Sequence, residues 1–318
     1  MGFLYSQFFV TPAYPTTSVE GQTVIVTGSN TGLGKEAARH FARLGAAKVI
    51  LAVRNTKAGE IAKADIDRTT KCKSDVVEVW QLDLGNYNSV KAFADKANKL
   101  RRLDVLLENA GVAGDKWHSS NGHERMIDVN VIATFYLALL MLPKLKSSAK
   151  EYNIKPRLTI VTSEVHGWSK FEERKEANIF EALDREKGAN LGERYPTSKL
   201  CEVLVVRELA PLLEGSNVTL NMTNPGLCHS ELSRDGSWIL EVMKFFLARK
   251  TEVGSRTLVA PAMAGPETNG IYFHDGKADD TALSAFVRSE DGKAAQGKVW
   301  KELSAILEKI QPGVTNQL

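Results

Sequence analysis

Short apolar runs rich in β-branched residues alternate along this chain with longer segments of amphipathic, helical pattern. The runs are almost continuously apolar, which is typical of strands that are covered on both faces. Strand–helix alternation at this spacing predicts an α/β fold: a single Rossmann-type, doubly wound parallel sheet of about seven strands with helices on both faces. The predicted strands are TVIVTG from Thr23, KVILAV from Lys48, VVEVWQLD from Val76, LDVLLENAG from Leu103, RLTIVTS from Arg157, NVTLNMTNPG from Asn217 and GIYF from Gly270.

The sequence contains no internal repeat, low-complexity tract or linker, so we expect a single catalytic domain over residues 21–318, preceded by an apolar arm at residues 1–20. The first helix should end at Gly45, which suits the C′ position. The segment around 229–250 follows a strand end and carries large apolar side chains, which predicts a substrate lid, although the same residues would suit the core. The longest apolar run, VIATFYLALLML at residues 131–142, is too short to span a bilayer and predicts a buried helix, so no transmembrane segment is expected.

Composition excludes several classes of protein. A formal net charge of +3 over 318 residues, with no run of Lys or Arg, argues against nucleic-acid binding. The three cysteines are scattered and form no C-x-x-C pair, which indicates neither a metal cage nor a disulfide framework and favours a reducing, cytoplasmic location. The aromatic N-terminus lacks the basic region of a signal peptide. Met1-Gly2 with Ser6 matches the loose myristoylation pattern, so peripheral membrane contact stays open.

The stretch TGSNTGLG lies between the first predicted strand and the first predicted helix. Gly28 allows a tight turn, Gly32 lets the backbone approach a phosphate, and Gly34 permits close packing. Helix N–H groups at this point would hold a pyrophosphate. The G-x-x-x-G-x-G spacing differs from the common dinucleotide fingerprint but occupies the place that the mechanism requires. We therefore expect dinucleotide contacts from Gly28, Asn30, Thr31, Gly32, Leu33 and Gly34.

The end of the second strand bears on the choice of cofactor. An acidic residue there would bind the ribose 2′-hydroxyl of NAD, but LAVRN offers Arg54 and no carboxylate. Arginine suits the 2′-phosphate of NADP, and Lys57 would add charge, whereas the alternative is an arginine that is merely solvated. We favour NADP(H). Small and polar residues at the other strand ends complete the expected groove: Asp83, Leu84, Asn109, Ala110, Gly111, Pro225 and Gly226.

Tyr195 and Lys199, in YPTSK, lie on one face if their segment is helical. A lysine ammonium beside a phenol favours the phenolate, and moving the phenol pKa from about 10 to near neutrality would take roughly 4 kcal/mol. A tyrosine tuned in this way can act as a general acid or base, although such pairs also arise by chance on surfaces. Ser163 ends the fifth predicted strand, and the Tyr195 helix follows it.

The motifs TGSNTGLG, LDL, ENAG, DVN, VTS, YPTSK and NPG occur here in the order of the short-chain dehydrogenase/reductase family. The sequence resembles that family over roughly residues 21–277. It looks most like the retinol-dehydrogenase-like branch, which includes fungal secondary-metabolism reductases. The family usually has Asn where Glu108 stands, a departure that bears on the packing of that strand end but leaves Asn109 in place.

The resemblance assigns roles to matching residues. Tyr195 would be the general acid in reduction and the general base in oxidation, while Lys199 would lower the Tyr195 pKa and bind the nicotinamide ribose. Ser163 would hold the substrate oxygen, with Thr162 the less favoured candidate, and Asn130 would anchor a water of the proton relay. The implied activity is NADP-dependent hydride transfer between the nicotinamide and a hydrophobic ketone or aldehyde, or the corresponding alcohol, without a metal.

Three questions stay open in the sequence. Trp117, Trp168 and the 229–250 segment suggest a hydrophobic substrate, such as a polyketide, terpenoid, retinoid or steroid-like ketone, and His166 or His229 could line its cleft. The alternatives in function are a non-redox dehydratase or isomerase, and a catalytically silent nucleotide-binding protein on the same fold. The resemblance also leaves a homodimer open.

Overall fold

The computed structural model describes residues 3–228 and 248–318, and its central feature is an eight-stranded sheet. The strand order is β10-β9-β8-β7-β4-β1-β2-β3. All neighbouring strands pair in parallel except β9 and β10, so the parallel sheet of seven strands is confirmed and a two-residue edge strand is added. The strands are β1 (Thr23–Thr27), β2 (Lys48–Val53), β3 (Val77–Gln81), β4 (Val105–Glu108), β7 (Arg157–Val161), β8 (Thr219–Asn224), β9 (Tyr272–His274) and β10 (Lys277–Ala278), with a separate small hairpin of β5 (Ser119–Ser120) and β6 (His123–Glu124).

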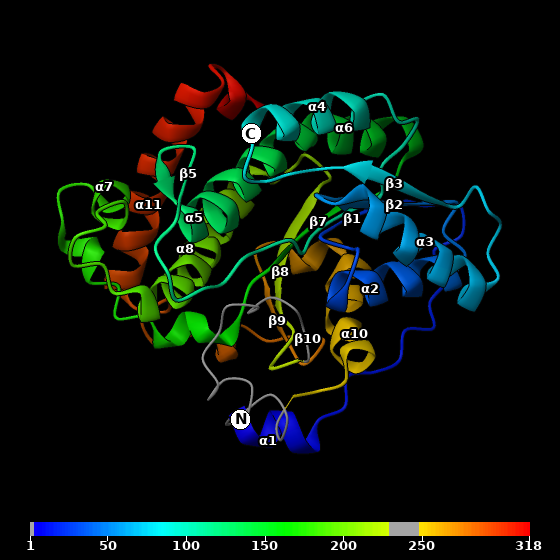
Figure 1. Ribbon diagram of the computed structural model, residues 1–318, viewed down its shortest axis with the longest axis horizontal. Helices are drawn as coiled ribbons and strands as arrows, with labels where there is room; N and C mark the ends of the chain where they lie inside the picture. Colours follow the sequence, from blue (N-terminus) through cyan, green and yellow to red (C-terminus); the bar gives the residue numbers. More distant parts are fainter. Residues whose placement is uncertain (1–2, 229–247) are drawn as a thin grey trace.

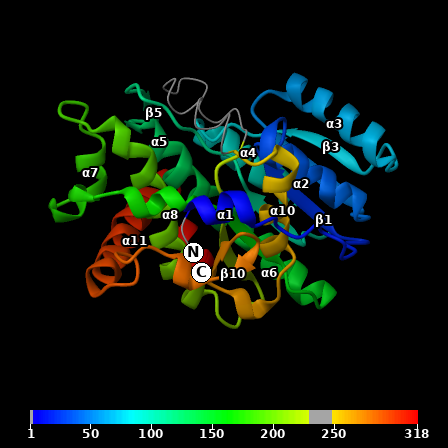
Figure 2. The same cartoon turned by 90° about the horizontal axis from the view of Figure 1, so that it is seen from below.

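Helices cover both faces of this sheet, as predicted (Figures 1 and 2). One face carries α4 (Tyr87–Ala97), α6 (Thr134–Tyr152) and α8 (Leu191–Leu212), with α11 (Glu290–Ile310) packed on α8. The opposite face carries α2 (Gly32–Arg43), α3 (Thr56–Thr70) and α10 (Thr251–Ala262). The shorter helical elements are α1 (Phe3–Phe9), α5 (Arg125–Ile127), η1 (Asp128–Ala133), η2 (Glu164–Trp168), η3 (Glu172–Lys175), α7 (Ile179–Leu183), η5 (Pro266–Thr268), η6 (Asp280–Ala282) and η7 (Val314–Gln317).

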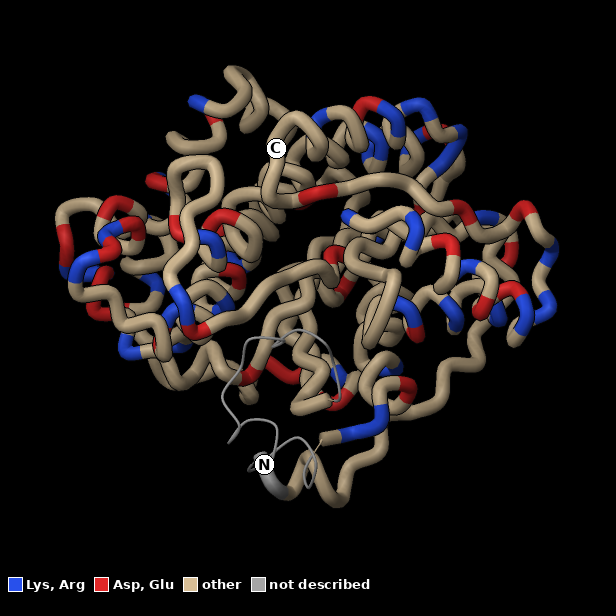
Figure 3. Tube along the Cα trace, in the orientation of Figure 1, with Lys and Arg blue, Asp and Glu red and all other residues tan. Residues whose placement is uncertain are grey.

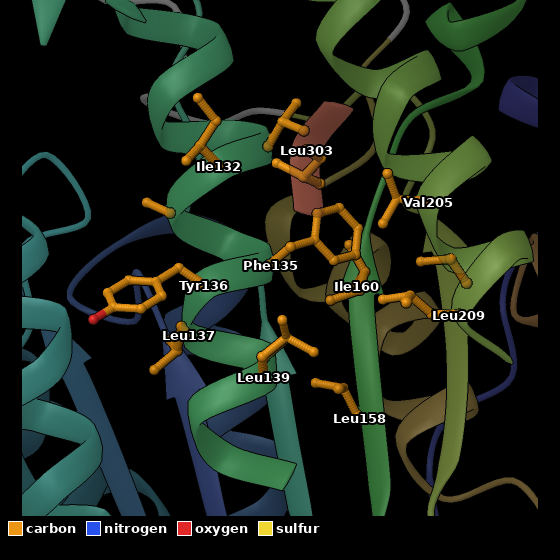
Figure 4. Close-up of a cluster of buried hydrophobic side chains, with 14 of the residues drawn as sticks. Ile132, Phe135, Tyr136, Leu137, Leu139, Leu158, Ile160, Val205, Leu209 and Leu303 are labelled. Carbon is orange, nitrogen blue, oxygen red and sulfur yellow. The ribbon is translucent and has the colours of Figure 1, made fainter. Parts of the chain in front are cut away.

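The larger core cluster fills the space between the sheet and the α6–α8 layer. Figure 4 shows Phe135 of α6 directed toward Ile160 of β7 and Val205 of α8, all of them buried. Leu303 reaches the same cluster from α11 (Figure 4). Dry packing of this kind makes the carboxyl edge of the sheet a rigid platform for a site.

The segment from Arg125 to Tyr152 runs as one helical rod through α5, η1 and α6. By length and composition it is the one described helix that could cross a membrane, with a mean hydropathy of 1.8 in its most apolar window. That window is 89% buried inside the fold, which fits the predicted core helix, although the rod is longer than residues 131–142 alone indicated.

Two local features position the site. Helix α2 ends as predicted at Gly45, whose φ is +93°, with Gly45 N–H donating to the Ala42 carbonyl and Ala46 N–H to the Phe41 carbonyl. The strand order reverses between β1 and β4, and ligands of open α/β sheets bind where the connections diverge at that carboxyl edge. Charged residues of both signs are spread over the outer helices, while the strands beneath are mostly uncharged (Figure 3).

Candidate active site

The loop between β1 and α2 is built from glycines that approach other backbone closely. Gly28 has a φ of +65°, and a Cβ added there would lie 2.9 Å from the Cα of Ala110. Gly32 has a φ of +59°, a conformation that L side chains rarely adopt. A Cβ on Gly34 would lie 2.7 Å from the Gly28 carbonyl oxygen. The loop therefore depends on glycine at the spacing seen in the sequence.

The end of β4 closes the same loop through hydrogen bonds. Thr27 Oγ1 accepts from the backbone N–H groups of Asn109, at 3.0 Å, and Ala110, at 2.9 Å. The Asn109 amide nitrogen donates to the carbonyl oxygens of Thr27 at 2.9 Å and Gly28 at 3.3 Å. The Asn109 side chain, predicted as a cofactor contact, thus holds the loop itself in shape.

The residues present fit a dinucleotide. Thr31 precedes α2 without a side-chain cap, and the first turn of α2 contains no acidic residue, so its N–H groups are left for an anion. The glycine cradle beside this helix end has no room for side chains. Asn30, Thr31 and Leu33 are half-buried at its rim. These features together are what a bound pyrophosphate requires.

Arg54 lies directly after β2, at the strand end next to the glycine loop. Its side chain is exposed, and so is that of Lys57. Among the described residues, no carboxylate forms an ion pair with Arg54. Asp83 and Leu84 follow β3 at the next strand end, where the Asp83 carboxylate accepts from the Gly85 N–H at 3.0 Å and Leu84 is buried.

Tyr195, Lys199 and Ser163 are brought together at the carboxyl edge of the sheet. Tyr195 and Lys199 lie on one face of α8, with the Lys199 ammonium 5.8 Å from the centre of the Tyr195 ring. The Ser163 hydroxyl, just after β7, lies close enough to the Tyr195 phenol to lower its pKa. A Cβ on Gly111 would lie 3.8 Å from Lys199 Nζ. Ala110 contacts the glycine loop, and Gly111 lies close to Lys199. The residues after β4 therefore lie between the glycine loop and the catalytic candidates Ser163, Tyr195 and Lys199.

The Tyr195 pKa is raised above its usual value in this protein. The lowering that was expected from Lys199 is outweighed by other effects. Burial raises the Tyr195 pKa most, the Lys199 ammonium lowers it, Glu202 raises it further, and the nearby Ser163 hydroxyl lowers it. Burial lowers the Lys199 pKa, but Glu202 and Tyr195 raise it, and the net shift is upward. The phenol is therefore protonated at neutral pH, and the lysine is charged.

The two neighbours of Ser163 have fixed partners of their own. The buried Thr162 hydroxyl donates to the Thr223 carbonyl oxygen at 3.1 Å, which leaves Ser163 as the hydroxyl that faces Tyr195. His166 is buried, so it does not line an open cleft. Its Nε2 accepts from Ser284 N–H at 3.1 Å, which makes Nδ1 the donor to the Ser163 carbonyl oxygen at 2.8 Å. Burial lowers the His166 pKa, so the ring is a neutral brace for the Ser163 turn.

Asn130 lies in η1, a π-helical turn between α5 and α6. Its Oδ1 accepts from the Val112 N–H at 2.8 Å, and its Nδ2 donates to the Val112 carbonyl oxygen at 2.9 Å and the Ser198 hydroxyl at 3.0 Å. A Cβ on Gly111 would lie 3.2 Å from Asn130 Oδ1. The Asn130 side chain therefore ties the loop after β4 to helix α8 beside Lys199.

The Pro225-Gly226 loop after β8 is held by the N-terminal arm. Gln7 of α1 donates to the Leu227 carbonyl oxygen at 2.8 Å and accepts from the Leu227 N–H at 3.2 Å. Arg249 is buried and donates to Asp275 at 2.6 Å and to the Ser6 carbonyl oxygen at 2.7 Å. Sequence reasoning missed this network because the N-terminal arm lies more than 200 residues from Leu227 and Arg249.

Sequence reasoning also missed the role of two acids beside Lys199. Glu202, on α8, accepts hydrogen bonds from Lys199 at 2.8 and 3.1 Å. Glu108 is the last residue of β4 and pairs in register with Ile160, and both of its carboxyl oxygens are buried without a hydrogen-bond partner among the described residues. The signals in the sequence were a charged residue in each apolar run and, for Glu202, its position three residues after Lys199 on the predicted helix.

Several predictions fall outside the described residues. They are the lid around 229–250, apart from its last residues, His229 as a cleft residue, and the lipid attachment at Met1-Gly2.

Trp168 is 60% exposed and Trp117 is half-buried. Within residues 3–228 and 248–318, no group of three or more His, Cys, Asp or Glu side chains is arranged to hold a metal ion.

Comparison with known proteins places these features in context. Residues 22–154 match the family model for short chain dehydrogenases. Across 99% of this chain and 99% of the relative, the sequence is 46% identical to short chain dehydrogenase/reductase dmxR8 of Cryptosporiopsis sp. (strain 8999).

Solved structures agree with this result. A protein from Mycobacterium paratuberculosis of uncharacterised function matches with a TM-score of 0.67 and 28% identity, over 91% of this chain and 96% of that one. The NADPH-bound carbonyl reductase from chicken fatty liver shares the fold, with a TM-score of 0.62 and 18% identity over 82% of this chain and 99% of that one.

Proposed function

This chain belongs to the short-chain dehydrogenase/reductase family, and on that premise we propose that it is an NADP-dependent oxidoreductase for a hydrophobic ketone or aldehyde, or the corresponding alcohol. The observation that carries the proposal is the contact series from Ser163 through Tyr195 to Lys199 beside the glycine loop. A proton donor, an oxygen-binding hydroxyl and a cation thus meet where the fold binds nucleotides.

Each residue has a distinct task in the proposed reduction. Ser163 holds the carbonyl oxygen of the substrate, and the neutral Tyr195 phenol donates its proton to that oxygen as negative charge develops. Lys199 stabilises the phenolate that remains, because its ammonium lies on the same face of α8. NADP(H), when bound, supplies or accepts the hydride. In the oxidation direction Tyr195 acts as the base.

The NADP preference is supported by two exposed cations, Arg54 directly after β2 and Lys57 in the first turn of α3. A guanidinium binds phosphate through paired hydrogen bonds, and a free 2′-hydroxyl offers no charge to match it. The carbonyl reductase from chicken fatty liver carries NADPH on the same fold, which adds support. The hydrophobic substrate class is supported by Trp168, which is largely exposed five residues after Ser163.

Replacement of the Tyr195 hydroxyl tests the proposal. We expect Tyr195→Phe to lower kcat by at least about 100-fold in NADPH oxidation with a panel of hydrophobic carbonyl compounds, because general acid catalysis contributes that much. NADPH binding, followed by fluorescence, should be retained. The matched control is Tyr136→Phe, which removes a phenolic hydroxyl bonded to Gln311 outside the site. Full turnover by Tyr195→Phe would refute the assignment, and failure of the wild-type protein to oxidise NADPH with any carbonyl would refute the activity.

A further inference from the structure

A buried charged cluster lies behind the proposed proton donor, and the reaction described above does not use all of it. Lys199 Nζ donates to both carboxylate oxygens of Glu202, at 2.8 and 3.1 Å, and to the Val161 carbonyl oxygen at 3.0 Å. The side chains of Lys199 and Glu202 are 6% and 3% exposed. Three acceptors therefore surround the three ammonium protons, and Glu202 fixes the direction of the lysine.

A second carboxyl group faces the same cluster from the sheet. Glu108 ends β4 in register with Ile160 of β7, one residue before the Val161 carbonyl that binds Lys199. Strand alternation places Glu108 on the same face as Leu106, which packs in the core beneath α8. Glu108 is 3% exposed, and neither of its oxygens has a hydrogen-bond partner in the described part of the chain.

The charges of this cluster determine the state of Glu108. Lys199 and Glu202 neutralise each other, so an ionised Glu108 would add an unpaired buried charge, which proteins avoid. Burial and the charge of Glu202 hold the pKa of Glu108 well above its usual range. Burial raises the pKa of Glu202 to about 7, against the lowering effect of Lys199. Above about pH 7, Glu108 therefore keeps its proton while Glu202 carries the negative charge beside Lys199.

We propose that Glu108 and Glu202 carry one proton and one negative charge between them, with the proton on Glu108, and that Glu202 positions the Lys199 ammonium beside Tyr195. The proposal rests on the proposed function, since it assigns positioning residues to the same site. Glu202 holds the lysine, and the proton on Glu108 keeps the buried cluster neutral. Loss of that proton would set two carboxylates against one ammonium and weaken the fold around Lys199.

The other titratable groups near this pair are accounted for. On α8 itself, Tyr195, Lys199 and Cys201 feel the charge of Glu202. The elements packed against α8 contribute groups that are engaged elsewhere: Asp128 of η1 with Tyr87, His166 of η2 with Ser163 and Ser284, and Glu302 of α11 with the backbone of Ile179. Glu202 in turn acts on Glu108 at the end of β4, where its charge raises the pKa of the Glu108 carboxyl.

Infrared spectroscopy of the protein without ligand tests the proton on Glu108 directly. At about pH 8, where ordinary carboxyl groups are ionised, the wild type minus Glu108→Gln difference spectrum should contain the carbonyl band of one protonated acid. Loss of a carboxylate band in its place would overturn the pair. The matched control is Glu208→Gln on the same helix, where Glu208 binds Gln296, and it should remove a carboxylate band. Glu108→Gln replaces a neutral acid with a neutral amide of similar shape, so it is the variant best suited to fold.

The pH profile of kcat tests the positioning role. In Glu202→Gln, Lys199 stays buried but loses the negative charge that raises its pKa. The alkaline limb of the kcat profile should therefore move down by about one pH unit or more. An unchanged alkaline limb would overturn the role of Glu202, and Glu208→Gln should keep the wild-type limb. If Glu202→Gln does not fold, the infrared result on Glu108→Gln decides the proposal alone. The infrared test needs no turnover, so its failure is distinguishable from failure of the proposed function.

Discussion

Gly34 in the first turn of α2 gives the sharpest prediction about the cofactor loop. A Cβ at this position would lie 2.5 Å from the Asn109 amide nitrogen and 2.7 Å from the Gly28 carbonyl oxygen. These two atoms belong to the hydrogen bonds that close the loop, and one of them is backbone, so neither can move without cost. Gly34→Ala should therefore strain the loop even though alanine favours helices.

The size of the effect follows from opposing contributions. Overpacking costs about 1–3 kcal/mol and a lost hydrogen bond about 1 kcal/mol, while alanine returns at most about 1 kcal/mol of helix propensity. We expect a net loss of about 2 kcal/mol. With an unfolding entropy of about 2.1 cal/mol/K per residue, this lowers the Tm of the chain by about 3 °C.

Gly297 provides the matched control, because it lies inside α11 and an added Cβ would meet nothing within 4 Å. Gly297→Ala should raise the free energy of unfolding by about 0.5–1 kcal/mol. Thermal unfolding of both variants, with and without NADPH, measures whether each substitution lowers or raises the stability. Titration gives the NADPH Kd. If Gly34→Ala is as stable as the wild type and binds NADPH equally well, close approach at this glycine is not what the loop requires.

Three further predictions concern charge. Arg54→Ala should lower the preference for NADPH over NADH by about tenfold or more, because a charge-assisted hydrogen bond contributes about 1.5–3 kcal/mol; parallel kinetics with both cofactors measure it, and an unchanged preference would contradict the assignment. Burial raises the folded-state pKa of Glu202 to about 7, above the usual value of 4.5. The contribution of Glu202 to the free energy of unfolding is full below about pH 4.5 and is lost as the pH rises through about 7. It amounts to about 3 kcal/mol. The free energy of unfolding of Glu202→Gln, measured in urea, should lack this part of the pH dependence. Asp275→Ala leaves Arg249 buried without its carboxylate and should cost about 3 kcal/mol, with faster proteolysis of the N-terminal arm, whereas Asp275→Asn should lose less.

The strands could be predicted from the sequence because burial on both faces leaves a continuous apolar run. Each of the seven runs contains a strand, from β1 at Thr23–Thr27 to β9 at Tyr272–His274. The two-residue strand β10 at Lys277–Ala278 leaves no such run, since its side chains are exposed and it is held by pairing alone. Hydrophobic periodicity therefore predicts the buried strands of a sheet and misses its short, exposed edge strands.

The site could be predicted in part for a related reason. Parallel strands end at one edge, so small and polar residues at successive strand ends meet there, and the structure brings Ser163, Tyr195 and Lys199 together at that edge. The network of Ser6, Arg249 and Asp275 could not be found in this way, because its members come from distant segments that share no local pattern.

Glu108 and Glu202 mark the limit of reasoning from apolar runs. Each acid interrupts such a run, in VLLE and in LCEVLV, and an interruption can mean either that the run ends or that a charge is buried within it. The two cases differ in what lies near the acid. Glu202 is paired with Lys199, three residues earlier on the same helix, whereas the surroundings of Glu108 come from the tertiary fold and give it no hydrogen-bond partner among the described residues. A buried acid without a partner is stable only when it is neutral. The burial of Glu108 therefore indicates that its carboxyl group carries a proton.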